Sequence, residues 1–588
     1  METPLSPLEF LRRSRRLYPD KEAVVDEGLR LTYAQFGERC DRWSAALQQL
    51  GVGPGDRVAY IAPNTHQQLE SFYAVPQIGA VLVPINYRLT SEDFAYIIGH
   101  SGAKVVCVHG DYLLDVERIR PQLPGVEQVI ALEGLTDALR ATGWHDYETL
   151  LAPAPTTFTR PTITEHDLLT INYTSGTTSR PKGVMITHRN AYMNVVGTLV
   201  HVHMTPSDRY LWTLPMFHAN GWTFTWVVTA VGGTHLCLRK VEPRAIFTTI
   251  HDERATMLCA APTVLIAIAN APADVKNILL ANTAAPAAVP VAANPEVASG
   301  QSRSRWPFGR KEQPDGVSAS TGASVASNGA TEAPTPAPTD HMVRVLTAGA
   351  PPAAATIERI EGELGWEITQ VYGLTETAPF ITICEPRAEH ATLSPSALAV
   401  IKARQGVELI TSGELLVVDE DGKEVAHDGQ ALGEIVARGN VIMQGYYNDT
   451  DATERAFQGG WFHSGDAAVV HPDGYIEIRD RLKDVIISGG ENISSVEVEG
   501  ILLRHPAVQE VAVVGLPDEK WGEAPHAFVV LKADHTATEE EMRAFARDSM
   551  AHFKVPKTFT FVAELPKTAT GKIQKYVLRG KRSAIATQ

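Results

Sequence analysis

Cysteine is scarce in this sequence, and its residues are too widely spread to form a recognisable cluster. None of them belongs to a C-x-x-C pair, so the sequence indicates neither a disulfide framework nor a cysteine-based zinc site. The five positions are Cys40, Cys107, Cys237, Cys259 and Cys384. Unpaired thiols of this kind are typical of a reducing compartment. We therefore expect a cytoplasmic location.

Excess positive charge is also missing. The chain has 52 Lys and Arg residues against 68 Asp and Glu residues, which gives a formal net charge of -16. This acidic balance argues against nucleic-acid binding and provides no general attraction to anionic lipid. It leaves room for a local basic pocket that binds a phosphate group.

The sequence contains no long hydrophobic run. Its most apolar window, residues 222–238, is interrupted by threonines, glycines and a histidine, and it is short for a membrane span. We expect a buried strand or helix there and no integral membrane segment. The N-terminal residues include arginines but no apolar core of a signal peptide, and the C-terminal AIATQ is not a peroxisomal tripeptide.

The 588 residues are too many for one hydrophobic core, so two or more domains are expected. In the first part of the chain, apolar β-branched runs alternate with a helix-like run. The strand-like runs are residues 57–63, 80–86 and 104–110, and the helix-like run is 64–79. This alternation predicts βαβ units around a largely parallel sheet, with a mixed sheet as the alternative. The predicted fold class is α/β.

Two later segments divide the chain further. Residues 281–340 are dominated by Ala, Pro, Ser, Thr and Gly without periodicity, so we expect a disordered low-complexity insertion. A strand follows within residues 342–352, and past Arg479 the chain has the pattern of a separate small unit. We therefore divide the chain into an N-terminal domain, residues 1–480, and a C-terminal domain, residues 481–588.

The stretch YTSGTTSRPKG at residues 173–183 has the glycines, hydroxyls and lysine of a phosphate-binding loop, but it lacks Walker spacing. Pro181 precedes Lys182 and Gly183 follows it, so no Ser or Thr after the lysine can hold magnesium. Glycine still permits close backbone approach, and the hydroxyls and the lysine still suit an anion. A polar turn after a strand at residues 168–174 is the alternative.

Four other motifs contain residue types suited to nucleotide chemistry. They are VYGLTETAP (371–379), WFHSGD (461–466), RDRLKDVIISGGENISSVEVE (479–499) and PKTATGK (566–572). In this order and spacing, together with the glycine–hydroxyl loop, they resemble the adenylate-forming superfamily of acyl-CoA synthetases, luciferases and peptide-synthetase adenylation domains. The resemblance covers nearly the whole chain except residues 281–340. Three motifs resemble the fatty-acyl-CoA synthetase branch: PMFHANGW (215–222), AGAPP (348–352) and GGENISSVEVE (489–499).

The resemblance implies a fold and a two-step reaction. The implied fold is a large N-terminal domain with parallel-rich sheets and a small, mobile α+β C-terminal domain. A carboxylate would attack the α-phosphate of ATP, giving an acyl-adenylate and pyrophosphate. The thiol of CoA would then take the acyl group and release AMP. ATP, Mg²⁺ and CoA are thus implied, with a carboxylic acid as the substrate, and a homodimer is compatible with the family.

The resemblance also implies roles at the nucleotide site. Thr177 and Glu376 would hold Mg²⁺, and Thr375 would bind the α-phosphate. Tyr372 would stack on adenine, and Asp466 would bind the ribose hydroxyls, as a carboxylate facing a diol does. The remaining implied ATP-binding positions are Thr174, Ser175, Gly176, Thr178, Lys182, Gly349, Ala350, Pro351, Gln370, Gly373, Arg481 and Lys483.

Further positions relate to the two half-reactions. Lys572 would reach the α-phosphate and the attacking carboxylate during adenylation, and a solvated lysine is the alternative. Lys483 resembles the hinge about which the C-terminal domain rotates. Ser488, Gly489 and Gly490 would then form a channel for the pantetheine arm of CoA.

The acyl side of the site is the least specified. His218 would position the carboxylate, and Trp222 and Trp226 would line the acyl tunnel, with core aromatics as the alternative. Each buried methylene contributes about 0.8 kcal/mol, so chain length depends on tunnel depth. We expect a medium-chain fatty acid, followed by short-chain or sulfur-containing, long-chain and aromatic acids. An adenylating enzyme with another acceptor and a non-catalytic nucleotide-binding protein are the other classes.

Overall fold

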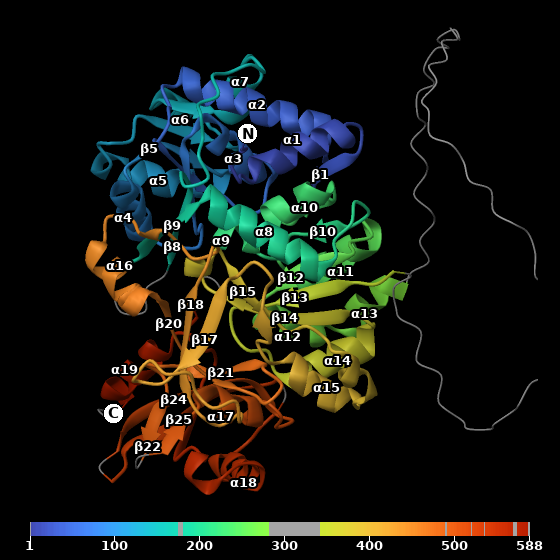
Figure 1. The fold of residues 1–588 in the computed structure, drawn as a ribbon, viewed down its shortest axis with the longest axis vertical. Coiled ribbons are helices and arrows are strands. Elements are labelled where there is room, and N and C mark those ends of the chain that lie inside the picture. The colour runs from blue at the N-terminus through green and yellow to red at the C-terminus, as the bar shows by residue number, and fades with distance from the viewer. Residues whose placement is uncertain are drawn as a thin grey trace, which may run out of the picture.

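The computed structural model describes residues 2–174, 180–280, 341–488, 491–518, 520–533, 535–567 and 573–585. The expected insertion at residues 281–340 lies outside this set, so its character stays a prediction. The described residues form two large sheets with flanking helices, then a small antiparallel sheet, and finally a C-terminal α+β unit (Figure 1). This arrangement confirms the predicted α/β fold class.

The larger sheet has nine strands and is parallel in its centre. Its order is β16-β15-β14-β13-β12-β10-β11-β1-β2, and every pair from β14 to β1 is parallel. The strands are β1 (Glu22–Asp26), β2 (Leu29–Thr32), β10 (Arg209–Leu211), β11 (Thr234–Cys237), β12 (Met257–Ala260), β13 (Arg344–Thr347), β14 (Glu367–Gly373), β15 (Phe380–Ile383) and β16 (Val407–Glu408).

The second sheet has eight strands in the order β19-β9-β8-β4-β3-β5-β6-β7, and it is parallel from β8 to β7. The strands are β3 (Arg57–Ile61), β4 (Val81–Ile85), β5 (Ala103–Val108), β6 (Gln128–Ala131), β7 (Trp144–Asp146), β8 (Leu168–Thr174), β9 (Lys182–Thr187) and β19 (Gly445–Tyr446). The predicted strands at 57–63, 80–86 and 104–110 are thus confirmed, and the predicted helix at 64–79 contains α3 (His66–Ala74).

Two smaller sheets complete the described chain. One is antiparallel, with β17 (Glu414–Val418), β18 (Gly433–Arg438), β20 (Phe462–Val470) and β21 (Ile476–Arg481). The C-terminal sheet contains β22 (Ile486–Ser488), β23 (Glu491–Ile493), β24 (Val508–Asp518), β25 (Gly522–Leu531) and β26 (Thr558–Phe561). The two sheets are separated by residues 482–485, and our division at residue 480 stays a prediction.

The helices begin at side-chain caps or prolines where the sequence supplies them. Thr32 caps α2 in a capping box with Gln35, and Thr538 does the same for α18 with Glu541. The N-terminal helices are α1 (Leu8–Leu17), α2 (Tyr33–Gln49), α4 (Ser91–Ser101), α5 (Leu113–Ile119), α6 (Asp137–Ala141), α7 (Tyr147–Leu151), α8 (His188–Val202), α9 (Ala219–Trp222), α10 (Phe224–Val231) and α11 (Pro243–Asp252). The later ones are α12 (Pro262–Ala269), α13 (Ala273–Lys276), α14 (Ala354–Leu364), α15 (Pro395–Lys402), α16 (Thr450–Ala456), α17 (Ser495–Leu502), α18 (Glu539–Ser549) and α19 (Lys575–Ile585).

The most apolar window, residues 222–238, is part of the interior. It contains the buried helix α10 and the strand β11, as the sequence predicted. Among the described residues, no single helix has the length and apolar character to cross a membrane. One bent pair in the described part of the chain, α12 together with α13 and the turn after it, satisfies that test, and it is bent by 98°.

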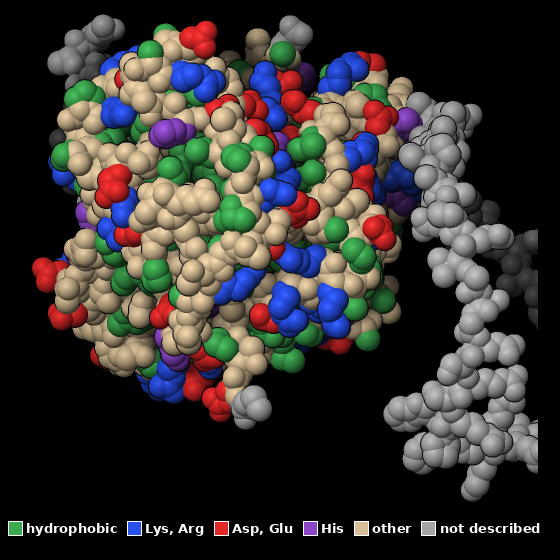
Figure 2. Space-filling model, turned by 90° about the horizontal axis from the view of Figure 1, so that it is seen from above, with side chains coloured by type: hydrophobic (Ala, Val, Ile, Leu, Met, Phe, Trp, Pro, Cys, Tyr) green, Lys and Arg blue, Asp and Glu red, His purple; other side chains and the backbone are tan. Residues whose placement is uncertain are grey.

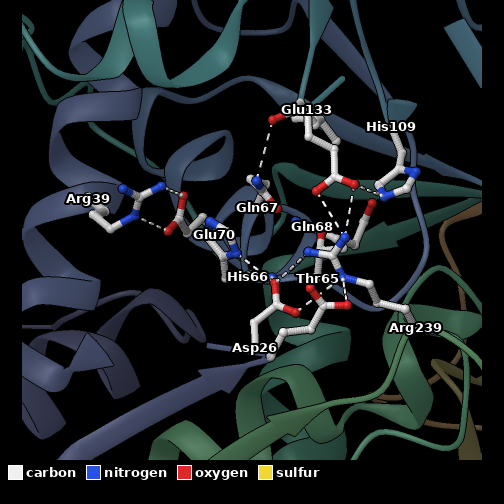
Figure 3. Close-up of polar contacts among 12 residues, drawn as sticks. Asp26, Arg39, Thr65, His66, Gln67, Gln68, Glu70, His109, Glu133 and Arg239 are labelled. Carbon is white, nitrogen blue, oxygen red and sulfur yellow. Dashed lines mark hydrogen bonds and ion pairs between the residues drawn. The ribbon is translucent and has the colours of Figure 1, made fainter. Parts of the chain in front are cut away.

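A polar network joins the two large sheets (Figure 3). Asp26 ends β1 of the nine-stranded sheet and accepts hydrogen bonds from the backbone N and from Nδ1 of His66, at 3.0 and 2.7 Å. His66 begins α3, directly after β3 of the eight-stranded sheet. Arg239, which follows β11, pairs with Asp26 at 3.4 Å and with Glu133 at 2.9 Å. Charged side chains therefore connect the strand ends of both sheets.

Surface charge is mixed on the face that Figure 2 shows. Acidic and basic side chains are interspersed there, without one large field of a single sign. The expectation that the protein has no nucleic-acid partner stays a prediction.

Candidate active site

Two of the predicted nucleotide motifs, AGAPP and VYGLTETAP, lie where β13 and β14 end. These strands are parallel neighbours, with Thr347 beside Gln370, so their carboxyl ends open at one edge of the sheet. The AGAPP turn, including Gly349, Ala350 and Pro351, follows β13. Its Gly349 has a φ of 90°, a left-handed conformation that favours glycine. Gln370 is buried, and its Oε1 has no hydrogen-bond partner among the described residues.

Gly373 shapes the turn after β14. A Cβ at this position would lie 1.8 Å from the carbonyl oxygen of Pro379, so no other residue fits without moving the backbone. Gly373 also pairs with Phe380 across β14 and β15. This close approach folds residues 375–377 into a short 3₁₀ turn, which presents the half-buried side chains of Thr375 and Glu376.

A second group of predicted residues is joined by direct contacts. The Tyr372 hydroxyl donates a hydrogen bond to Oδ2 of Asp466 at 2.7 Å. Nε of Arg481 pairs with Oδ1 of the same carboxylate at 2.7 Å. Burial and the Asp466 charge raise the pKa of Tyr372, so its hydroxyl keeps the proton that it donates. The residues predicted to bind adenine and ribose therefore lie together, although Tyr372 and Asp466 are 94 residues apart in the sequence.

Glu376 contacts Tyr446, which is not among the residues predicted from the sequence. The Tyr446 hydroxyl donates to Oε1 of Glu376 at 2.9 Å. Burial and the neighbouring Glu376 charge raise the pKa of Tyr446, so this hydroxyl is also protonated. The Lys182 ammonium lies 4.7 Å from the centroid of the Tyr446 ring. The only sequence signal for Tyr446 was an aromatic pair after a glycine, at residues 445–447.

The Glu376 carboxylate is suited to bind a magnesium ion that phosphate oxygens also coordinate. Within the described part of the chain, only Tyr446 donates to the Glu376 carboxylate, so the second oxygen remains available. No group of three or more His, Cys, Asp or Glu side chains among the described residues is arranged to hold a metal. Mg²⁺ commonly uses one or two protein oxygens plus substrate phosphates, which is what Glu376 offers.

The predicted acid-binding motif folds into an unusual left-handed turn. Residues 219–223 all have positive φ values, between 38° and 66°. Left-handed helical geometry costs roughly 1–2 kcal/mol for each residue with a Cβ, so the surrounding structure must hold this turn in place. The turn directly follows His218, which is half-buried.

Buried asparagines hold this turn. Asn220 donates to Oγ1 of Thr170 at 2.9 Å, and Asn172 donates to Oδ1 of Asn220 at 3.1 Å. Asn64 accepts from the backbone N of Met216 at 2.8 Å. These contacts were not predictable from the sequence, because the partners lie far from each other along the chain.

The two tryptophans of the acyl motif have different surroundings. Trp222 is 4% exposed, and its ring meets Phe380 edge-on with centroids 5.8 Å apart. It therefore lies beside the turn that holds Glu376. Trp226 is 1% exposed and packs edge-on against Phe72 of α3. Both tryptophans thus belong to the buried core, which was the alternative given for them, and the tunnel role of both stays a prediction.

Several predicted residues lie outside the described part of the chain. They are Ser175, Gly176, Thr177, Thr178, Gly489, Gly490 and Lys572. Thr174, the last residue of β8, is described and pairs with Lys182 of β9. The roles of all these positions stay predictions.

The predicted hinge residue Lys483 and the described channel residue Ser488 lie in different surroundings. Burial lowers the pKa of Lys483, which also senses the charges of Asp484 and Asp466. Ser488 ends β22, at the lower end of the molecule in Figure 1 and remote from β14. Lys483 thus interacts electrostatically with Asp466 of the nucleotide site, and the channel role of Ser488 stays a prediction.

Comparison with known proteins identifies the family. The AMP-binding enzyme model matches residues 11–447, and the AMP-binding enzyme C-terminal domain matches residues 497–572. The chain belongs to the AMP-binding enzyme family. It is an AMP-forming acid–thiol ligase with ATP, Mg²⁺ and CoA as its cosubstrates and cofactor. The resemblance drawn from the sequence motifs is thereby confirmed.

Named relatives match along almost their whole length. 4-Hydroxybutyrate–CoA ligase 2 of Metallosphaera sedula is 39% identical, with 99% of this chain and 96% of the relative covered. Acetate/butyrate–CoA ligase AAE7, peroxisomal, of Arabidopsis thaliana is 38% identical, with 98% and 95% covered. The crystal structure of the anthranilate CoA ligase AuaEII with anthranoyl-AMP superimposes with a TM-score of 0.80, at 25% identity and full coverage of both chains. Our cytoplasmic location and homodimer stay predictions.

Proposed function

We propose that this AMP-binding enzyme activates a short aliphatic carboxylic acid and transfers it to CoA. In the first half-reaction the carboxylate oxygen bonds to the α-phosphorus of ATP, and the bond to the bridging oxygen of pyrophosphate breaks. In the second, the CoA sulfur bonds to the acyl carbon, AMP leaves, and the thiol proton is released to solvent. Acyl-CoA, AMP and pyrophosphate are the products.

The observation that supports a short acid is the packing of Trp222 against Phe380. Both rings are buried, and Phe380 is paired directly with Gly373 of the nucleotide turn. Aromatic rings therefore fill space next to the predicted carboxylate position, and the asparagine-held turn restrains Trp222. A long acyl chain would have to displace a ring that is 4% exposed.

The named relatives support the same choice. Two of them are named for acids of two or four carbons, namely acetate, butyrate and 4-hydroxybutyrate. They are 39% and 38% identical to this chain over nearly all of it. The medium-chain fatty acid expected from the sequence, and with it a role in fatty-acid metabolism, is the second candidate.

The proposed residue roles follow from the contacts in the site. Tyr372 and Asp466 hold adenine and ribose, with Arg481 fixing the Asp466 carboxylate. Thr375 donates to the α-phosphate, and Glu376 provides an oxygen ligand for magnesium. When bound, magnesium neutralises phosphate charge during attack. His218 orients the acid, and Lys182 stabilises the departing pyrophosphate by its positive charge.

A panel of acids tests the substrate. Pyrophosphate release is measured for acids of two to twelve carbons, for branched and hydroxylated four-carbon acids and for benzoate, each with and without CoA. We expect the highest kcat/KM for acids of two to five carbons, with the rate dependent on CoA. A maximum at eight to ten carbons would support the medium-chain candidate instead. Release that does not require CoA, with an acyl-adenylate accumulating, would favour another acceptor.

A further inference from the structure

Tyr446 belongs to a short segment, residues 443–446, that forms two hydrogen bonds with Glu376, the predicted magnesium ligand. Its hydroxyl donates to Oε1 of Glu376 at 2.9 Å. Three residues earlier, the backbone N of Met443 donates to the carbonyl oxygen of Glu376 at 2.8 Å. The Met443 contact joins two main-chain groups, so it does not depend on which side chain stands at position 443. Both the main chain and the side chain of Glu376 are therefore fixed by residues 443–446.

The same segment is tied to the strand that follows the predicted phosphate loop. β19 pairs antiparallel with β9, with Tyr446 opposite Val184. The backbone N of Gln444 donates to the carbonyl oxygen of Met185 at 3.0 Å. Because β9 begins at Lys182, residues 443–446 set the position of Glu376 relative to the lysine of the loop.

The Tyr446 side chain lies between two opposite charges. Its hydroxyl binds the Glu376 carboxylate, and the Lys182 ammonium lies 4.7 Å from its ring centroid, within range of a cation–π interaction. Among the described residues, Lys182 and Glu376 each contact Tyr446, and no ion pair joins them to each other. Direct pairing would neutralise both groups, and neither would then be fully available to magnesium or phosphate.

We propose that Tyr446 is a positioning residue for magnesium-bound ATP. Its hydroxyl holds one oxygen of Glu376 so that the other faces the metal, and its ring keeps Lys182 from pairing with that carboxylate. This inference rests on the proposed function, in which Glu376 is the magnesium carboxylate.

The test compares Tyr446→Phe with the matched variant Tyr447→Phe. The first change removes the hydroxyl and keeps the ring. The second removes the neighbouring hydroxyl, which makes no hydrogen bond among the described residues. ATP affinity is measured by calorimetry with and without Mg²⁺, and the Mg²⁺ concentration for half-maximal pyrophosphate release is measured in parallel.

We expect Tyr446→Phe to reduce the Mg²⁺-dependent gain in ATP affinity by about tenfold, as loss of a hydrogen bond to a charged group does. The half-maximal Mg²⁺ concentration should rise by a similar factor, while kcat at saturating Mg²⁺ and the melting temperature stay near wild type. Tyr447→Phe should keep the wild-type Mg²⁺ dependence. Tyr446→Leu, which also removes the ring, should weaken ATP binding without Mg²⁺ as well, because Lys182 can then pair with Glu376.

A structural role gives a different pattern. If Tyr446→Phe lowers the melting temperature and kcat at every Mg²⁺ concentration without shifting the Mg²⁺ dependence, the proposal is wrong. Glu376→Gln separates this failure from failure of the proposed function. If Glu376→Gln retains the wild-type Mg²⁺-dependent gain in ATP affinity, Glu376 is not the magnesium carboxylate, and both assignments are overturned.

Discussion

Asp466 is the side chain on which the nucleotide end of the site is centred. It is 3% exposed, and its two oxygens contact Tyr372 of β14 and Arg481 of β21. A carboxylate oxygen can accept more than one hydrogen bond, so these contacts are compatible with ribose hydroxyls on the same group. One buried carboxylate therefore aligns the proposed adenine and ribose contacts.

We predict that Asp466→Asn raises the KM for ATP by about 10- to 100-fold. The amide removes the charge that pairs with Arg481, and hydrogen bonds to charged groups contribute about 1.5–3 kcal/mol. Steady-state kinetics with ATP as the varied substrate measures the effect. Asp473→Asn is the matched control, since Asp473 pairs with Arg404 at 3.2 Å. An equal rise in KM for both variants would contradict a specific role for Asp466.

The left-handed turn at residues 219–223 is the element that shapes the acyl side. Its sequence suggested a histidine and a tryptophan near the acid, but not five successive positive φ values. Such a backbone depends on partners such as Asn64 and Asn172, which precede the turn by many residues. The geometry of the turn is therefore a tertiary property that local sequence does not specify.

Substitution at Gly221 tests the turn. Gly221 has a φ of 58°, and a Cβ there would lie 2.5 Å from the buried ring of Trp212. We predict that Gly221→Ala destabilises the protein by about 1–2 kcal/mol or more, from the left-handed conformation and this contact. The KM for the acid should rise several-fold, since Trp222 moves with the turn. Thermal unfolding and acid-dependent kinetics measure the two effects.

Gly362→Ala provides the control for this prediction. Gly362 lies within helix α14, and a Cβ there would meet nothing within 4 Å. Alanine is the better helix former, so this variant should be neutral or slightly more stable. If Gly221→Ala is no less stable than Gly362→Ala, the turn is not held as we describe.

Regular elements were predictable because their pattern is local. The strands β3, β4 and β5 are apolar, β-branched runs, and the α3 region shows helical spacing, so periodicity sufficed. Tyr446 was not predictable in the same way. It meets Glu376 only because β19 pairs with β9, and these two strands lie far apart in the sequence.

The proposed reaction has two half-reactions that depend on how the C-terminal domain is placed against the rest of the molecule. We predict that substitutions in this domain can block one half-reaction and spare the other. The backbone N of Ser495, which begins α17, donates to Asp480 of β21 at 2.8 Å, so the C-terminal unit is docked across the predicted hinge. Lys572→Ala should abolish adenylate formation while sparing thioester formation from supplied acyl-adenylate. Gly489→Leu should do the reverse. Single-turnover assays of each half-reaction measure this, and equal loss of both steps in either variant would refute the assignment.

The network between the two large sheets makes stability depend on pH. Burial opposes the charged form of His66, but hydrogen bonds to Asp26 and Glu148 outweigh it and raise the pKa of His66 to about 9. The ordinary value is near 6.5, so the folded state binds this proton more tightly than the unfolded state. The resulting stabilisation is fully present below pH 6.5 and is lost as the pH rises through about 9.

We predict that His66→Gln lowers the melting temperature by several degrees at pH 6, and that this difference shrinks as the pH rises toward 10. The neutral amide can still occupy the site beside Asp26, but it cannot carry the charge that stabilises this carboxylate at low pH. Thermal unfolding of both proteins across pH 6–10 measures the difference. His427→Gln is the control, because His427 and its partner Glu424 are about half exposed and such surface pairs contribute little. A His66→Gln deficit that is the same at pH 6 and pH 10 would show that packing, rather than the His66 charge, joins the two sheets at this point.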